Sequence, residues 1–146
     1  MKHIVLITFF TILISCEEKK GNEILTSKLI KLEKENQKLK DSIFNLNEKF
    51  IYSQVLHGTP ETMILKTGKK NKIFMNFYTF KQKMPDYEIF KLENGTEVKV
   101  GNDNNSNFIY DFIPDSIGEN NLELIVKIPF DNKIIEKRAN MHFLAE

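Results

Sequence analysis

Apolar and polar residues follow three different patterns along this chain, and each pattern predicts a different element. Residues 4–14 form an apolar run that contains no charged residue and only two threonines, directly after Met1-Lys2-His3. From residue 22 to residue 55, apolar residues recur with a helical period that neither Pro nor Gly interrupts. Beyond residue 60, short apolar runs alternate with turn residues, which is typical of strands. The sequence therefore predicts a mainly β protein, with a long N-terminal coiled-coil helix followed by a small antiparallel β-sandwich.

The helical segment, residues 22–56, carries a heptad repeat whose d positions are four leucines spaced seven residues apart. The predicted interface consists of Leu25, Leu29, Leu32, Asn36, Leu39, Ile43, Leu46 and Phe50. In a parallel pair, Lys28 would face Glu33 of a second copy, and Glu35 would face Lys40 in the same way. An Asn at a central a position favours a parallel, in-register pair. We therefore expect a parallel homodimer or homotrimer.

The only cysteine of the chain, Cys16, follows the first apolar run. A basic start, an apolar stretch and a small residue before this cysteine have the plan of a secretory signal. Leu13-Ile14-Ser15-Cys16 resembles the lipobox of bacterial lipoproteins. That resemblance implies removal of residues 1–15 as a signal peptide and attachment of acyl chains such as palmitate to Cys16. It also implies an envelope protein held in a membrane by its lipid, and we expect the outer membrane, at either its periplasmic or its surface face.

The segment behind the anchor leaves alternatives open. Residues 16–21 are polar and predict a short flexible tether. Ile30, Phe44 and Ile51 fall on b positions, which a simple dimer exposes. The helix therefore either self-associates, packs against its own domain, or stands alone as a solvated stalk. We favour self-association, because chains anchored by their N-termini in one membrane already point the same way.

The head domain, residues 60–146, is predicted to hold about seven strands. His57-Gly58-Thr59-Pro60 is expected to end the helix, since Pro restricts the residue before it and Gly is a common stop. Asn94-Gly95 is the strongest short-range hairpin signal, and Asp131-Asn132 joins the last two apolar runs. The predicted strands are residues 62–66, 72–80, 87–92, 96–100, 107–113, 122–130 and 133–144. This number of short strands predicts a β-sandwich, with an open barrel as the alternative.

One part of the head resembles the immunoglobulin-like domains of bacterial exported proteins. An aromatic run over residues 108–112 leads through Pro114 and Gly118 into an apolar run that begins at Leu122. The resemblance extends generically over residues 60–146 and implies an immunoglobulin-like β-sandwich. The disulfide and the core Trp of antibody domains are absent from the sequence. Because this fold supports many unrelated functions, the resemblance implies no mechanism.

Charge narrows the class of partner. Removing residues 1–15 takes away Lys2 and no acidic residue, so the 21 basic residues become 20 and balance the 20 acidic ones. A nucleic-acid-binding protein would carry an excess of Lys and Arg gathered on one face. The sequence therefore predicts no nucleic-acid partner.

The residue types that carry chemistry are scattered. His57 and His142 stand alone, whereas zinc needs three or four ligands. The segment 101–107 is rich in side-chain oxygens, but Asp103 is its only carboxylate, which favours a plain turn over a calcium site. The four lysines within residues 66–72 predict an exposed hairpin tip, with contact to anionic lipid or polysaccharide as the alternative. We expect no metal, no cofactor and no enzymatic activity.

The sequence thus favours a non-enzymatic envelope lipoprotein whose stalk presents the head for protein–protein interaction or a structural role, with a partner that the sequence leaves unidentified. One alternative is an inhibitor or immunity-type lipoprotein, which binds a single envelope protein as a monomer with its helix packed on the head. The other is a carbohydrate-binding module. Its candidate aromatic residues are Phe74, Phe77, Tyr78, Phe80 and Tyr87, unless they fill the core.

Overall fold

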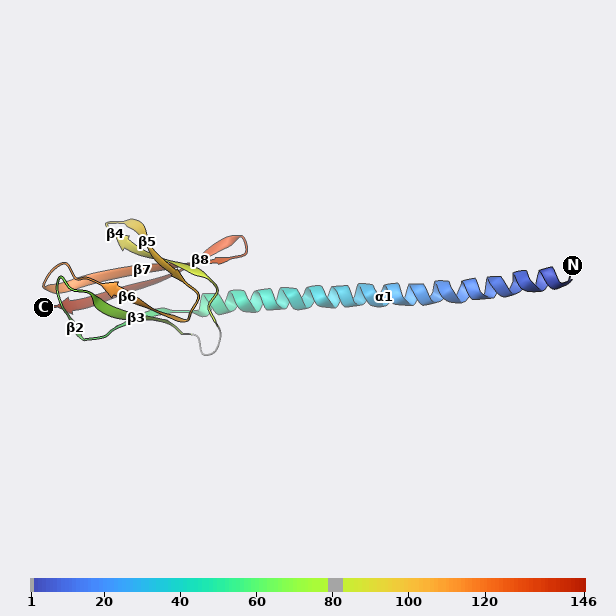
Figure 1. The fold of residues 1–146 in the computed structure, drawn as a ribbon, viewed down its shortest axis with the longest axis horizontal. Helices are drawn as coiled ribbons and strands as arrows, with labels where there is room; N and C mark the ends of the chain where they lie inside the picture. Colours follow the sequence, from blue (N-terminus) through green and yellow to red (C-terminus); the bar gives the residue numbers. More distant parts are fainter. Residues whose placement is uncertain (1, 79–82) are drawn as a thin grey trace. The chain divides into compact units, whose positions relative to one another are not determined.

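The computed structural model describes residues 2–78 and 83–146, and describes side chains from residue 22 onward. The chain divides into two compact units, Met1–Leu46 and Asn47–Glu146. Within the described residues, one helix, α1 (Lys2–Ser53), is followed by eight strands (Figure 1). The strands are β1 (Leu56–Pro60), β2 (Ile64–Leu65), β3 (Asn71–Phe77), β4 (Tyr87–Glu93), β5 (Thr96–Asp103), β6 (Asn107–Phe112), β7 (Gly118–Phe130) and β8 (Lys133–Ala145).

Helix α1 differs from the prediction at both ends. It continues through residues 16–21, which we expected to be a flexible tether. A single glycine such as Gly21 destabilises a helix by only about 1 kcal/mol relative to alanine, so the helix can continue through it. At the other end α1 stops at Ser53 rather than at residue 56. There the Ser53 hydroxyl and the Gln54 side-chain amide both donate to the Phe50 carbonyl, which satisfies a free C=O of the last turn.

The segment expected to break the helix is itself a strand. β1 pairs antiparallel with β3, from Leu56 opposite Phe77 to Pro60 opposite Ile73. Pro60 lies at the end of this edge strand, where a residue without an N–H is tolerated. The head therefore begins its strands at Leu56, and the predicted boundary at residue 60 was wrong.

The seven predicted strands are all present, with changed bounds. The predicted strand 62–66 shrinks to the two residues of β2, whereas β7 begins at Gly118, four residues before the predicted start. The last two residues of predicted strand 72–80 lie outside the described residues. Asn94 and Gly95 adopt φ values of 51° and 80°, as the turn of a β4–β5 hairpin requires. The prediction of a mainly β chain with one long N-terminal helix is confirmed.

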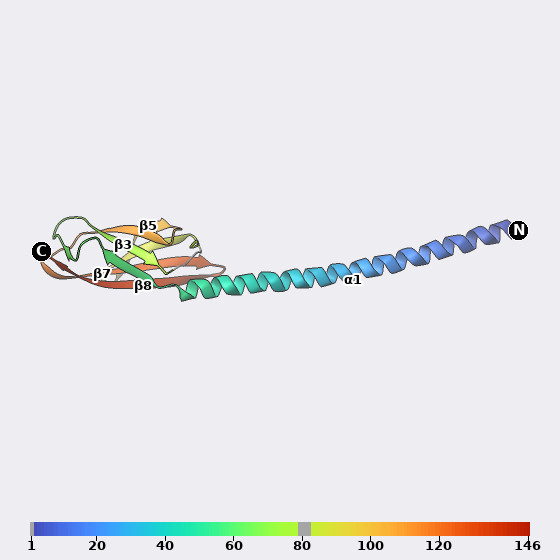
Figure 2. The same ribbon diagram turned by 90° about the horizontal axis from the view of Figure 1, so that it is seen from below.

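The strands form two sheets. One has three strands in the order β1-β3-β6, and the other has five in the order β2-β8-β7-β4-β5. The described pairings are antiparallel except that β2 runs parallel to β8. Figures 1 and 2 show these strands from two directions.

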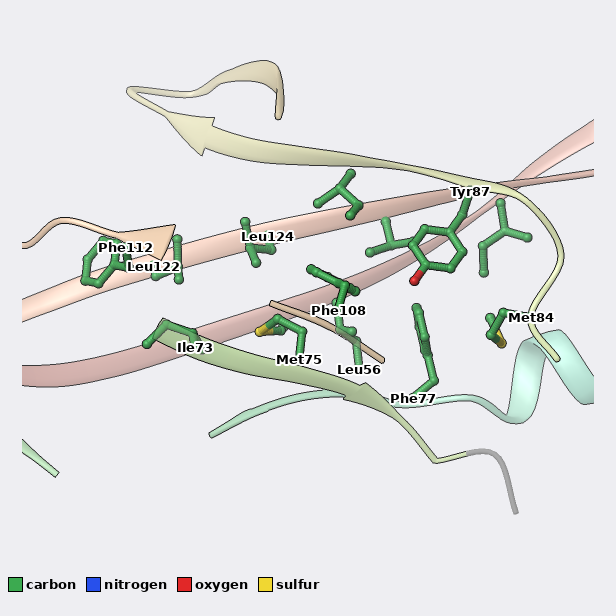
Figure 3. Close-up of a cluster of buried hydrophobic side chains, with 14 of the residues drawn as sticks. Leu56, Ile73, Met75, Phe77, Met84, Tyr87, Phe108, Phe112, Leu122 and Leu124 are labelled. Atoms are coloured by element: carbon green, nitrogen blue, oxygen red, sulfur yellow. The ribbon is translucent and has the colours of Figure 1, made fainter. Parts of the chain in front are cut away.

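A single hydrophobic core lies between the two sheets (Figure 3). Phe112 of β6 and Phe143 of β8 have ring centroids 5.7 Å apart, and Tyr87 of β4 lies 6.1 Å from Phe108 of β6. The residues at the centre of the core are fully buried: Leu65, Ile73, Met75, Leu122, Leu124, Val126 and Ile128. Side chains from both sheets therefore fill one common interior.

Gly58 of β1 is required by this packing. A Cβ at this position would meet the sulfur of Met141 and, at 2.8 Å, the sulfur of Met75. We expect Gly58→Ala to lower the free energy of unfolding by about 1–3 kcal/mol, because both methionines must move. Urea unfolding measures this change. Gly101→Ala in β5 is the matched control, since its added Cβ lies 3.9 Å from the nearest atom, the Ile89 Cδ1; equal effects of the two substitutions would contradict the prediction.

Candidate functional site

Cys16 falls within α1, in the part of the chain whose side chains are not described. Its predicted lipidation therefore stays a prediction. In the described part of the chain, no helix has both the length and the apolar character that crossing a membrane requires.

The heptad positions of the first unit form an apolar column that this chain leaves open to solvent. Their side chains are between 57 and 66 % exposed: Leu25, Leu29, Leu32, Leu39, Ile43 and Leu46. Asn36, in the centre of the column, is exposed as well. An apolar column of this length, regularly spaced and uncovered by its own unit, is typical of a surface that binds another helix.

Phe50, the next a position, behaves differently. It is partly buried and packs against the core of the head, and its neighbour Ile51 is only 1 % exposed. The exposed column therefore ends at Leu46, and the last turns of α1 belong to the unit that contains the strands.

Two lysines of β8 form contacts with the last turns of α1. The Lys137 ammonium donates a hydrogen bond of 2.7 Å to the Tyr52 carbonyl, and the Lys133 ammonium forms an ion pair with Glu48. Both ammonium groups lie over the Tyr52 ring, at 5.9 and 5.4 Å from its centroid. Burial lowers the pKa of Lys137, whereas the hydrogen bond with Glu48 raises that of Lys133. Sequence analysis missed these contacts, because no spacing signal links residues 85 positions apart.

Two hollows are found on the second unit. The larger, about 710 Å³, is open and has polar and apolar surface in nearly equal parts; its lining residues are Asp86, Tyr87, Glu88, Lys99, Asn102, Asp103, Asn104 and Pro129. The smaller, about 420 Å³, is mainly apolar and is lined by Asn47, Phe50, Ile51, Lys83, Met84, Pro85 and Phe130. Among the described residues, no group of three or more His, Cys, Asp or Glu side chains has the arrangement that holds a metal ion.

The loop considered as a calcium site is organised by Asp103 itself. Its Oδ1 accepts hydrogen bonds from the backbone amides of Asn104 and Asn105, at 2.6 and 3.0 Å. The same oxygen also accepts one from the Asn105 side-chain amide at 2.7 Å. This carboxylate oxygen is thus used to close a turn between β5 and β6.

The aromatic residues considered for carbohydrate binding are divided between core and surface. Phe77 and Tyr87 are buried, with ring centroids 5.5 Å apart, whereas Phe74 and Tyr78 are exposed. Phe80 lies outside the described residues. The described members therefore do not form one exposed aromatic platform.

The remaining candidates lie on the surface or in strands. His57 on β1 and His142 on β8 are both exposed. The four lysines of residues 66–72 are all exposed, as predicted, but they do not form a hairpin tip, because β2 and β3, which this segment connects, belong to different sheets. Lys70 pairs with Asp111 at 3.4 Å, which leaves this segment partly neutralised.

Tyr87 makes the stability of the head sensitive to alkaline pH. Its hydroxyl donates to the Asn105 carbonyl at 2.8 Å, and burial, followed by the charge of Asp103, raises its pKa far above the ordinary value. Because the folded state retains this proton, the stabilisation is fully present below about pH 10 and is lost as the pH rises above that value. We expect the free energy of unfolding to fall by up to about 1.4 kcal/mol per pH unit from this group alone.

Tyr87→Phe is expected to remove this part of the slope, at a cost of about 1 kcal/mol at neutral pH for the lost hydrogen bond. Urea midpoints between pH 8 and about 11 measure both effects. Tyr78→Phe, at an exposed tyrosine, is the matched control. An unchanged slope in the Tyr87 variant would contradict the assignment.

Comparison of the chain with protein-family models, with curated proteins and with solved structures gave no match in any of the three.

Proposed function

We propose that this chain is a non-enzymatic, lipid-anchored protein of the bacterial envelope, in which paired coiled-coil helices present β heads to a protein partner. The observation that carries the proposal is the exposed heptad column from Leu25 to Leu46. The occupant of this column is a second copy of the chain, because the flanking charges complement each other across a parallel pair. In such a pair Lys28 faces Glu33, and Glu35 faces Lys40. Two or three heads held together bind a repeated partner with higher avidity than one head does.

The strand order supports an immunoglobulin-like β-sandwich for the head. The run β8-β7-β4-β5 follows the order G-F-C-C′ of the larger sheet in that fold. β1, β3 and β6 then occupy the places of strands A, B and E in the facing sheet. The Pro114–Gly118 corner lies between β6 and β7, at the place of the E–F connection.

The anchor is tested at Cys16. In a bacterial host fed a clickable palmitate analogue, the unchanged chain is expected to be labelled and to fractionate with membranes. Cys16→Ser is expected to lose both properties, because one thiol is the attachment point that the lipobox resemblance implies. The double variant Cys16→Ser with Ser27→Cys is the matched control, since it restores a thiol outside the lipobox and is expected to stay unlabelled. Labelling of Cys16→Ser would overturn the anchor.

A specific observation also favours an inhibitor or immunity-type lipoprotein. Ile51 and Phe50 pack into the core of their own head, as a monomeric binder with a docked helix requires. That function predicts one chain per partner molecule. The mass of the purified complex, measured by light scattering, distinguishes it from the multivalent proposal.

A further inference from the structure

On one side of the head, the five-stranded sheet extends further than the three-stranded sheet that it faces. β6, the edge of the three-stranded sheet, lies against β4, as the contact of Tyr87 with Phe108 shows (Figure 3). On the opposite side, β1 lies against β8, because Gly58 packs under Met141. β5 lies one strand beyond β4, so the larger sheet extends past β6.

Val98 of β5 faces the space that this difference leaves, and Val100 lies near it on the same strand. Val98 lies opposite Lys91, which shares the inner face of β4 with buried Ile89 and Tyr87. Val100 lies at the register shift between β4 and β5, and a Cβ at the next residue, Gly101, would contact the buried Ile89 side chain. Val98 and Val100 are nevertheless 41 and 42 % exposed. The inward face of β5 therefore lacks a facing strand among the described residues.

β6 offers the pairing groups that such a strand needs. The Phe77 amide donates to the Ser106 carbonyl at 2.8 Å, which fixes the hydrogen-bonding phase between β3 and β6. In an antiparallel ladder, every second residue of a strand forms its backbone hydrogen bonds with the neighbouring strand. The residues of β6 that bond to β3 are therefore Phe108, Tyr110 and Phe112. Asn107, Ile109 and Asp111 then direct their N–H and C=O groups to the free edge of the sheet. No described strand pairs with this edge.

The other sheet edges carry features that discourage strand addition. β1 contains Gly58 and Pro60, and β2 has only two residues. β5 carries paired charges at Glu97 and Lys99, and a register shift interrupts its pairing with β4. Edges of natural sheets are protected in these ways.

By contrast, β6 has neither Pro nor a bulge, and its central outward side chain is Ile109, 57 % exposed. Phe74, its neighbour on β3, extends this apolar surface.

The geometry points to β6 as the acceptor edge for an extended segment of a partner protein. The added strand pairs its backbone with Asn107, Ile109 and Asp111, and its inward side chains cover Val98 and Val100. The segment it fits alternates apolar inward residues with outward residues that pack beside Ile109. This inference rests on the proposed function, since it names the surface by which the head binds its partner.

The test uses the full chain in detergent and, as its probe, a capped peptide of about eight residues that alternates valine and threonine. Hydrogen exchange is followed residue by residue. Without peptide, the amides of Ile109 and Asp111 are expected to exchange faster than those of Phe108 and Tyr110. With saturating peptide, exchange at Ile109 and Asp111 is expected to slow by about tenfold or more.

Three variants locate the interaction. Ile109→Pro removes one outward N–H, and the pair Val98→Lys with Val100→Lys replaces the apolar cover at exposed positions. Each is expected to weaken peptide binding by about tenfold or more. Ile134→Lys, at an exposed isoleucine of β8, is the matched control and is expected to bind normally. If Ile109→Pro fails to fold, peptide binding by the variant with Val98→Lys and Val100→Lys is the test of the inference.

Three results would overturn the inference, and the first two are peptide protection at β1 or β5 instead of β6 and the absence of protection at saturating peptide. Self-association that Ile109→Pro abolishes would also overturn it, since the edge would then bind a second copy. Oligomeric state is measured on the same samples. A chain that is oligomeric but ignores the peptide refutes this inference alone, whereas a monomer that binds the peptide refutes the multivalent part of the proposed function alone.

Discussion

A chain that carries Leu32→Lys and Leu39→Lys is expected to be monomeric where the unchanged chain is a dimer or trimer. Both leucines occupy d positions and are more than 60 % exposed in the single chain. Burying each side chain against a second copy contributes about 1.5–3 kcal/mol, and lysines at the same places bring like charges together. The dissociation constant is therefore expected to rise by about a thousandfold or more. Sedimentation of residues 16–146 with Cys16→Ser, over a range of concentrations, measures this change.

The matched control replaces two exposed isoleucines of the same helix in place of the two leucines, as Ile24→Lys and Ile30→Lys. These residues are 54 and 58 % exposed but lie outside the a and d positions. In a simple pair they stay in water, so association is expected to remain unchanged. Equal dissociation by both pairs of substitutions would show that non-specific apolar contact holds the chains together. A monomeric unchanged chain at high micromolar concentration would refute the coiled coil itself.

The strands were predictable where the turn chemistry is local. Asn94-Gly95 predicts a hairpin because both residues accept a positive φ, and the structure has them at 51° and 80°. Asp131, at the tip of the β7–β8 hairpin, also adopts a positive φ. In both cases the signal and the structure that it predicts lie within a few residues.

β1 was not predictable for the opposite reason. Its Gly58 and Pro60 are typical of a break, and only pairing with β3 makes the segment a strand. Gly58 is present because methionines from β3 and β8 pack where its side chain would lie. Gly58 packs against residues that are distant in the sequence, but its local sequence is the same as that of a glycine that ends a helix.

The same limit applies to the candidate site. The heptad spacing predicts which residues form an apolar column, and the structure leaves Leu25 to Leu46 exposed as a group. Periodicity does not reveal what covers a given position, so Phe50 has the pattern of another a residue although it packs on the head. The uncovered valines of β5 were likewise beyond prediction, because they depend on the order of strands in two sheets.

Replacing Ile51 by Ala is expected to destabilise the head strongly. Ile51 occupies a b position, which the heptad pattern assigns to the outside of a pair, yet it is buried in the core cluster together with residues of both sheets. Deleting most of a buried isoleucine side chain costs about 2–5 kcal/mol, from lost burial and from the cavity that remains. Urea unfolding of the Leu32→Lys, Leu39→Lys chain measures this cost without a contribution from association.

Ile30→Ala in the same background is the matched control, because Ile30 occupies another b position and is 58 % exposed. Its expected effect is within about 0.5 kcal/mol. A large difference between two residues with the same heptad position would show that the last turns of α1 are part of the head's core. If both substitutions cost equally little, the helix end contributes nothing to that core. The observation that favours a monomeric inhibitor-type function would then be removed, and the exposed heptad column would remain as the main evidence on how the chain acts.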